Sequence, residues 1–363
     1  MARIRVGILF GGRSAEHEVS ILSARNVVAA LDRERFDPVL IGVGRDGRWL
    51  LQDERRLLAS SGDPRRVDLG EGTVVSLATL PTATAGGGGI DVVFPVLHGP
   101  MGEDGTVQGL LELAGLPYVG AGVLGSAVGM DKDVAKRLLR AAGIAIADYR
   151  VVRKGELQRD PESACRKAAG VGFPLFTKPA NLGSSVGVVQ VPDAGSLRAA
   201  LAHAFEYDTK ALAEEMIRGR EIECSVLGDD LDARASIPGE IVVRHSDGFY
   251  SYEAKYIDES GAALEIPARL ATSQVEAVRR MAIDAFHALE GHGMARVDFF
   301  LREDGTLLVN EVNTIPGFTA ISMYPKLWEA SGVTATELIT RLIDLALARH
   351  AARGSLRTTR SEG

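Results

Sequence analysis

The chain has 363 residues, of which 46% are hydrophobic and 25% are charged, a composition typical of a soluble globular protein with two or three domains. Its formal net charge of -7 argues against nonspecific binding to nucleic acid, whose phosphates need clustered lysine and arginine, but it does not exclude a nucleotide ligand in a local basic pocket. Its two cysteines exclude a disulfide framework and favour a reducing cytoplasm, and no apolar run approaches the ~20 residues of a membrane helix.

The first part of the chain alternates strands with helices. Apolar runs at Ile4–Phe10, Phe36–Gly44 and Ile90–Gly99 predict three strands. Helices are predicted at Ser20–Leu31 and Thr106–Gly115. This alternation predicts an α/β unit in which helices wrap a parallel sheet.

The pattern changes after an amphipathic helix at Met130–Gly143, where short strands predict a small α+β unit with a helix at Ser196–Phe205. A third region follows, with a long helix at Ser273–Leu289, a strand hairpin and a last helix at Ala335–His350. We predict an N-terminal α/β domain at residues 1–129, a central subdomain at 130–222, a C-terminal subdomain at 223–350 and a disordered tail at 351–363.

Oxygen-bearing side chains converge on the hairpin "ARVDFFLREDGTLLVNEVN". Glu311 and Asn313 share one face of their strand because side chains alternate, and Asp298 can face them from the neighbouring strand. Two carboxylates and a carboxamide suit Mg²⁺, which prefers oxygen ligands and substrate phosphates. The alternative is a solvated sheet face with unrelated polar residues.

The stretch "KPANLGSSVGV" places Lys178 at the end of a strand, before a loop of glycine and serine. Such a loop offers backbone N–H groups and hydroxyls to an anion, so it predicts a phosphate site. It lacks the lysine and serine or threonine of the P-loop. A flexible hairpin loop is the alternative interpretation.

Two loops of the N-terminal part carry candidate substrate ligands. Glu16 follows the Gly11-Gly12 turn, where it would repel a pyrophosphate and could instead bind an amine, although a helix N-terminus also favours an acid. His98 opens a glycine-rich loop after a strand, the usual place for ligands in α/β proteins, but a lone histidine is more often structural.

The stretch "FYSYEAKYI" combines aromatic residues with Lys255 in a region without a regular pattern, which suggests a lid over Tyr250–Ile257 that excludes water; a strand with a packed aromatic face is the alternative. Arg296 shares a strand face with Asp298 and could stabilise an anionic transition state, or could form a structural salt bridge.

The order of these motifs resembles that of the D-alanine–D-alanine ligases, a family within the ATP-grasp superfamily. The resemblance runs from about Ile4 to Ala348 and rests on long stretches: "ILFGGRSAEHEVS", "VLHGPMGEDGTVQG", "GMDKDVAKRLL", "KPANLGSSVGV", "EIECSVLG", "YEAKYI", "MARVDFFL" and "LLVNEVNTIPGFTAISMYPKLW". It implies an N-terminal domain followed by a two-lobed ATP-grasp fold that grips ATP between its lobes.

The resemblance also implies roles for individual residues. The phosphates of the nucleotide would be bound by Lys132 and Lys178, by the flap Gly183–Gly187 with Ser185, and by Lys255 of the lid. Its adenine and ribose would lie against Glu214 and Glu221. Two Mg²⁺ ions, for which Mn²⁺ can substitute, would be bound by Asp298, Glu311 and Asn313. The amino acids and the oxyanion would be bound or stabilised by Glu16, His98, Arg296, Gly317, Ser322 and Met323, with Ser184 and Tyr256 tying the flap and the lid to Glu16.

The activity implied by the resemblance is the ATP-dependent ligation of two D-alanine molecules through a D-alanyl phosphate, for peptidoglycan precursors. Relatives that make D-alanyl-D-lactate often carry a histidine in the lid, whereas the phenol of Tyr256 carries no charge that would repel an incoming ammonium. We therefore predict the dipeptide, with a D-alanine–D-lactate ligase or another ATP-grasp carboxylate–amine ligase as the alternative.

Two other classes of protein fit the sequence less well. A nucleotide-binding regulator without turnover predicts gaps among Lys178, Arg296, Asp298, Glu311 and Asn313, and all five are present. A dinucleotide-dependent dehydrogenase would need a third glycine after the first strand. The resemblance further implies a cytoplasmic homodimer that contacts neither membrane nor nucleic acid.

Overall fold

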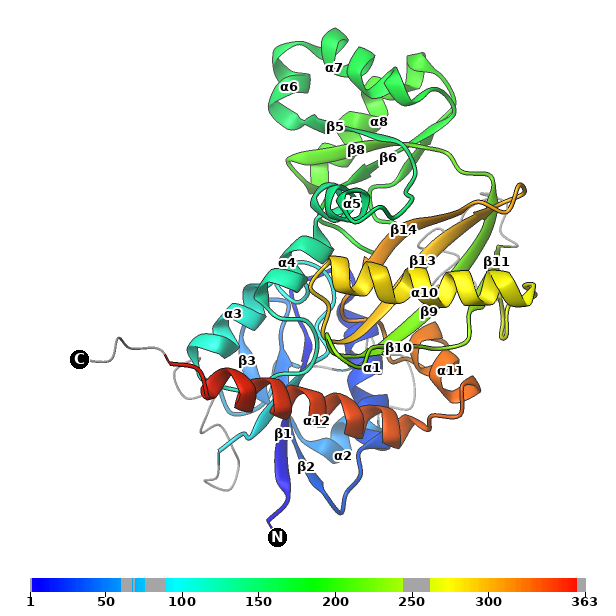
Figure 1. Ribbon diagram of the computed structural model, residues 1–363. Coiled ribbons are helices and arrows are strands. Elements are labelled where there is room, and N and C mark those ends of the chain that lie inside the picture. The colour runs from blue at the N-terminus through cyan, green and yellow to red at the C-terminus, as the bar shows by residue number, and fades with distance from the viewer. Residues whose placement is uncertain (1, 60–66, 68, 76–88, 244–261, 358–363) are drawn as a thin grey trace, which may run out of the picture.

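Three β-sheets form the frame of the molecule in the computed structural model, which describes residues 2–59, 67, 69–75, 89–243 and 262–357 (Figure 1). The N-terminal sheet lies at one end, the central sheet at the other, and the C-terminal sheet between them. Among the helices of these described residues, none combines the length and the apolar character needed to cross a membrane.

The N-terminal sheet has the strand order β3-β2-β1-β4. Its bounds are β1 Ile4–Gly11, β2 Phe36–Val43, β3 Trp49–Leu51 and β4 Val92–Pro95. Because β1 is parallel to both β2 and β4, the predicted parallel sheet is confirmed, while β3 adds an antiparallel edge. The helices of this part are α1 His17–Ala30, α2 Glu54–Ala59, α3 Thr106–Leu113 and α4 Val123–Met130.

The central sheet is entirely antiparallel, in the order β5-β8-β6-β7. Its strands are β5 Tyr149–Arg153, β6 Leu175–Pro179, β7 Val189–Val191 and β8 Lys210–Glu215. Helices α6 Lys154–Arg159, α7 Pro161–Ala168 and α8 Ala194–Tyr207 lie on its outer side, and α5 Lys132–Ala141 lies between this sheet and the next (Figure 1). The helix predicted at Met130–Gly143 is therefore confirmed, with its first residue at Lys132.

The C-terminal sheet has the order β12-β11-β9-β13-β14, with β10 paired to β9. Its strands are β9 Gly219–Gly228, β10 Arg234–Ala235, β11 Gly239–Val243, β12 Ala262–Glu265, β13 Gly293–Arg302 and β14 Leu307–Asn313. Helices α10 Thr272–Ala288 and α11 Met323–Ala330 pack on it. The predicted boundary between residues 222 and 223 falls inside β9, because this strand is hydrogen-bonded to β13 along its whole length.

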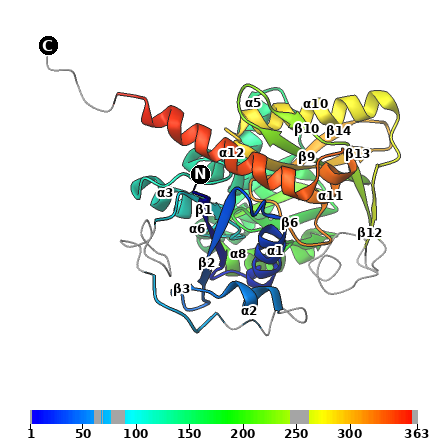
Figure 2. The same cartoon turned by 90° about the horizontal axis from the view of Figure 1, so that it is seen from below.

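The last helix, α12 Ala335–Gly354, packs against the N-terminal part of the chain. Leu338, Leu342 and Ile343 of this helix belong to the same buried cluster as Ile8 and Phe94 of the N-terminal sheet. Figure 2 shows α12 crossing from the side of α11 and β9 toward the N-terminal strands. The predicted tail at 351–363 is wrong at its start, since α12 continues to residue 354. The division into domains otherwise stays a prediction.

Candidate active site

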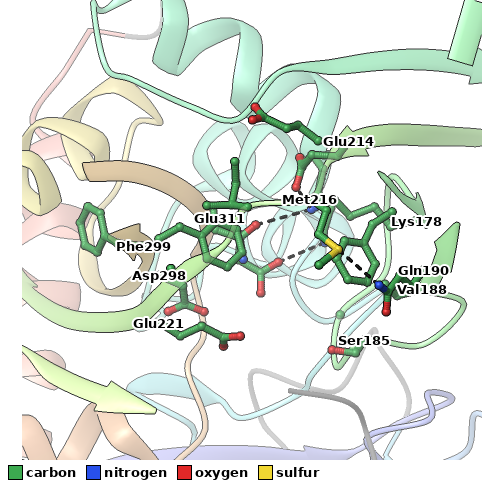
Figure 3. A pocket seen from close by; sticks show the side chains of 18 of the residues that line it. Lys178, Ser185, Val188, Gln190, Glu214, Met216, Glu221, Asp298, Phe299 and Glu311 are labelled. Atoms are coloured by element: carbon green, nitrogen blue, oxygen red, sulfur yellow. Dashed lines mark hydrogen bonds and ion pairs between the residues drawn. The ribbon is translucent and has the colours of Figure 1, made fainter. Parts of the chain in front are cut away.

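Two adjoining cavities lie where the three sheets meet. The larger has a volume of about 330 Å³ and the smaller about 100 Å³, and Ser184, Glu223 and Glu311 line both. The larger cavity is lined by the predicted nucleotide and metal residues Lys132, Lys178, Ser185, Glu214, Glu221, Asp298 and Glu311, together with Ser184. Figure 3 shows how Lys178, Glu214, Asp298 and Glu311 lie in this cavity. The smaller cavity is lined by the predicted substrate residues Glu16, His98, Arg296, Gly317, Ser322 and Met323, together with Asn313.

The hairpin β13–β14 brings the predicted metal ligands together. Asp298 stands directly opposite Glu311 in the ladder, and a bulge follows between Asp298 and Phe299. The Asn313 side-chain amide donates a hydrogen bond to Asp298 at 3.0 Å. Strand alternation, with Glu311 and Asn313 two residues apart, therefore produced the convergence that the sequence predicted.

Arg296 lies between two carboxylates beside these ligands. Its guanidinium donates two hydrogen bonds to Asp298, both at 2.7 Å, and its Nε lies 3.0 Å from Glu223 Oε2. Burial opposes the charge of Arg296, but Asp298 and then Glu223 outweigh it and raise the pKa of the guanidinium well above its ordinary value. The group is a fixed cation held in one plane, which suits a developing oxyanion.

Lys132 is the first residue of α5, whose start is fixed by its flanking residues. The Asp131 carboxylate caps the helix by accepting from the N–H groups of Asp133 and Val134. Lys210 of β8 lies 2.5 Å from the same carboxylate and ties the helix to the central sheet. The Lys132 ammonium lies 2.6 Å from the carbonyl oxygen of Leu182 and 3.3 Å from Glu311. It therefore links the segment just before the flap Gly183–Gly187 to the hairpin β13–β14.

Lys178 and Glu214 project from neighbouring strands into the larger cavity (Figure 3). Lys178 Nζ donates to Glu214 Oε1 and lies 3.5 Å from the Asn310 side-chain oxygen. The other oxygen of Glu214 lies 2.7 Å from the ammonium of Lys136, which is buried on α5. Glu214, predicted as an adenine-pocket residue, thus also pairs with two lysines.

The loop Gly183–Gly187 closes over Glu16. The hydroxyl of Ser184 donates a hydrogen bond to a Glu16 carboxylate oxygen across 168 residues of chain. Ser184 and Ser185 have φ values of 52° and 59°, in the left-handed region that non-glycine residues rarely occupy. A side chain at Gly183 would begin 3.3 Å from Glu16, so the glycine permits the close approach. The structure therefore places this loop in contact with Glu16.

His98 and Glu103 lie beside Glu16 in the smaller cavity. Burial lowers the pKa of His98, so its imidazole is neutral at neutral pH; its Nε2 lies 3.5 Å from Ser23 Oγ. Burial, followed by repulsion from Glu16, raises the pKa of Glu103 to about 8, and Glu103 accepts the N–H of Gly99 at 2.6 Å. The Glu103 carboxyl is therefore largely protonated at neutral pH.

The segment after β14 forms the far wall of the smaller cavity. Ser322 precedes α11, and its hydroxyl accepts the Thr319 N–H at 3.0 Å. A Cβ on Gly317 would lie 2.8 Å from Ser322 Oγ, so a larger residue here would require the Ser322 side chain to move. Gly317, Ser322 and Met323 are therefore brought together as predicted, on a short turn that leads into a helix start.

Two predicted site residues, Lys255 and Tyr256, lie outside the residues that the structure describes, as does the predicted lid Tyr250–Ile257. Conversely, the sequence interpretation missed Glu103, Lys136 and Glu223. A signal existed for Lys136, because it stands four residues after Lys132 on one helix face. Glu223 shares a strand face with Glu221, two residues away, and could have been found by alternation.

The donor set on the hairpin fits a divalent cation. Among the residues that the structure describes, no group of three or more histidine, cysteine, aspartate or glutamate side chains could hold a metal ion. The candidate set instead combines two facing carboxylates, Asp298 and Glu311, with the carboxamide oxygen of Asn313. Hard oxygen donors that leave room for substrate phosphates are the ligands Mg²⁺ prefers.

Known proteins resemble this chain over nearly its whole length. A family model described as D-ala D-ala ligase N-terminus matches residues 5–121, and one described as D-ala D-ala ligase C-terminus matches residues 138–344. The D-alanine--D-alanine ligase A of Salmonella typhimurium is 48% identical over 369 residues, covering 99% of this chain and 100% of the relative. That of Chromobacterium violaceum is 51% identical over 357 residues, covering 96% of each.

Solved structures agree with these relatives. The D-alanine-D-alanine ligase from Coxiella burnetii superposes with a TM-score of 0.82 at 39% identity, covering 98% of this chain and 97% of that one. The VanG D-Ala:D-Ser ligase from Enterococcus faecalis has the same TM-score at 36% identity, covering 95% of this chain and all of that one.

Proposed function

Because this chain belongs to the D-alanine–D-alanine ligase family, we propose that the two adjoining cavities are the active site of an ATP-dependent ligase that joins two D-alanine molecules for peptidoglycan synthesis. The family and the ATP-grasp fold predicted from the sequence are both confirmed. The observation that supports the proposal is that Glu311 lines both cavities, so the cavity proposed to hold the nucleotide phosphates adjoins the one proposed to hold the first amino acid.

The first D-alanine binds in the smaller cavity, with its ammonium at Glu16 and its carboxylate near Arg296. A free carboxylate is a poor acyl donor, so it first attacks the γ-phosphorus of ATP, and ADP leaves. Lys132 and Lys178 neutralise charge on the transferring phosphoryl group. When bound at Asp298, Glu311 and Asn313, Mg²⁺ or Mn²⁺ would supply further neutralisation of that charge. The product of this step is a D-alanyl phosphate.

The second D-alanine docks its carboxylate at Ser322 and Met323, at the start of α11, where a helix N-terminus favours an anion. Its amine, after losing a proton, attacks the carbonyl carbon of the acyl phosphate. Arg296 and the Gly317 N–H stabilise the tetrahedral oxyanion, and inorganic phosphate leaves as the peptide bond forms. Acyl phosphates hydrolyse, so the reaction needs a dry site, which is the role proposed for the lid at Tyr250–Ile257.

The remaining residues serve the nucleotide and the flap. Ser185 and Lys255 bind phosphate oxygens, Glu214 and Glu221 line the base and ribose side, and His98 supports the first amino acid. Ser184 holds the flap against Glu16, and Tyr256 holds the lid against it. The hydrogen bond from Ser184 to Glu16 supports this role for the flap.

An amino-acid-dependent phosphate-release assay tests the proposed function. We expect the purified chain to release phosphate from ATP when D-alanine and Mg²⁺ are present, and to form D-alanyl-D-alanine in equal amount. L-alanine should not support release, because its methyl group would point in a different direction from that of D-alanine when its ammonium lies at Glu16 and its carboxylate near Arg296. NADH should be neither bound nor consumed. Phosphate release that ignores D-alanine would contradict the proposal.

The same assay with an equal mixture of D-alanine and D-lactate separates the dipeptide ligase from the depsipeptide alternative. We expect the dipeptide to predominate at neutral pH, because the phenol of Tyr256 carries no charge that would repel an ammonium. A predominance of D-alanyl-D-lactate would show that the second subsite selects differently.

The cytoplasmic homodimer implied by the resemblance stays a proposal. Its support in the structure is that the α3–α4 surface exposes apolar side chains, with Leu113 at 91% and Leu124 at 60% exposure. Sedimentation velocity of the purified chain should give twice the mass of one chain, and a single-chain mass at micromolar concentration would rule the dimer out.

A further inference from the structure

Lys136 is a buried lysine with no role in the mechanism described above. It lies on α5, one turn after Lys132, and only 1% of its surface is exposed. Burying an ammonium group is costly, and an apolar side chain of the same size is often neutral or stabilising at such a position. The buried ammonium of Lys136 is therefore expected to have a function that depends on its charge and on the group with which it pairs.

That partner is Glu214, which lies between two ammonium groups. Its Oε2 is 2.7 Å from Lys136 Nζ, and its Oε1 accepts from Lys178 Nζ. Glu214 of β8 stands opposite Phe176 of β6, and Lys178 is two residues further along, so both side chains project from the same face of the sheet. Glu214 and Lys178 line the larger cavity, whereas Lys136 is not part of its lining.

The charges of Lys136, Lys178 and Glu214 do not cancel. Two ammonium groups and one carboxylate leave a net charge of +1, whereas the pair Lys178–Glu214 alone would be neutral. A nucleotide phosphate entering the cavity would then compete with Glu214 for Lys178. We propose that Lys136 is a positioning residue, which shares the charge of Glu214 and thereby leaves the charge of Lys178 available to the nucleotide phosphates.

The electrostatic surroundings agree with a charged cluster. Burial raises the pKa of the Glu214 carboxyl, but Lys136 and then Lys178 outweigh it and leave that pKa below its ordinary value. Burial lowers the pKa of Lys136, while Glu214 acts in the opposite direction. The Lys136 ammonium also lies 5.9 Å from the centre of the Tyr149 ring, whose face favours a cation.

A double-mutant cycle on nucleotide binding tests this role. The variants are Lys136→Met, Glu214→Gln and the double variant, and the measurement is the dissociation constant of a non-hydrolysable ATP analogue with Mg²⁺. Lys136→Met should weaken binding about tenfold in the wild-type background and less than about threefold when residue 214 is glutamine, because the amide does not compete for Lys178. Adenosine, which has no phosphates, should bind wild type and Lys136→Met within about twofold of each other.

Several outcomes would overturn the inference. Unchanged analogue affinity in Lys136→Met, or an equal loss in both backgrounds, would show that Lys136 does not act through Glu214. Lys136→Arg keeps the charge and should bind within about threefold of wild type, so it tests the inference even if Lys136→Met fails to fold. A tenfold loss in that variant would mean that shape rather than charge matters.

The inference rests on the proposed assignment of Lys178 to the nucleotide phosphates, and Lys178→Met separates the two. Weaker analogue binding in Lys178→Met but not in Lys136→Met would overturn the inference alone. Unchanged binding in Lys178→Met would overturn the assignment of the phosphate site itself.

Discussion

Replacing Glu311 by glutamine should lower kcat by at least about 100-fold while the protein stays folded. The substitution keeps the size of the side chain and removes its charge. That carboxylate faces Asp298 across the hairpin, lies 3.3 Å from Lys132 and lines both cavities. Its loss should weaken the binding of Mg²⁺ and the alignment of Lys132 together. Steady-state kinetics over a range of Mg²⁺ concentrations and the thermal midpoint measure the two effects.

Glu303 provides a matched control, because it lies exposed in the turn of the same hairpin. Glu303→Gln should keep the wild-type kcat and Mg²⁺ dependence. If Glu311→Gln turned over at the wild-type rate without a shift in its Mg²⁺ requirement, the assignment of the metal site to this hairpin would be wrong.

Replacing Arg296 by lysine should lower kcat by roughly 100-fold to 1000-fold, with a much smaller effect on KM for ATP. Lysine keeps the charge but loses the planar group that now bonds Asp298 twice and also reaches Glu223. An oxyanion donor acts mainly in the transition state, so the loss should appear in kcat rather than in ground-state binding. Rapid-quench measurement of peptide formation would locate the affected step.

The control for this variant is Arg234→Lys, since Arg234 pairs with Asp232 at 2.8 Å on the exposed edge of the same sheet. It should keep wild-type kinetics. A loss confined to KM for ATP in Arg296→Lys would place Arg296 on the nucleotide and remove it from the oxyanion site.

The sequence predicted best those parts of the site that local periodicity determines. Asp298, Glu311 and Asn313 belong to one hairpin, so strand alternation and a tight turn are enough to bring them together. The parallel N-terminal sheet was predictable for the same reason, because apolar strands alternate with helices along the chain.

Contacts between distant segments were not predictable from periodicity. Ser184 meets Glu16 across 168 residues, and only the resemblance to a known family suggested that pairing. Lys136 and Glu214 meet because a helix packs on a sheet, which no local pattern specifies. No helix was predicted at α11, although its apolar residues recur at helical spacing, as in Met323 and Leu327, and a proline in the first turn is compatible with a helix start.

The return of α12 to the N-terminal sheet has a consequence for synthesis of the chain. Ile8 and Phe94 are translated early. Leu342 and Ile343, which pack in the same buried cluster, are translated only near the end of the chain. The first sheet is thus translated long before α12, which forms part of its cover. A premature stop codon before Leu342 would remove Leu342 and Ile343 and leave the apolar face that they cover exposed, and quality-control proteases should clear that product.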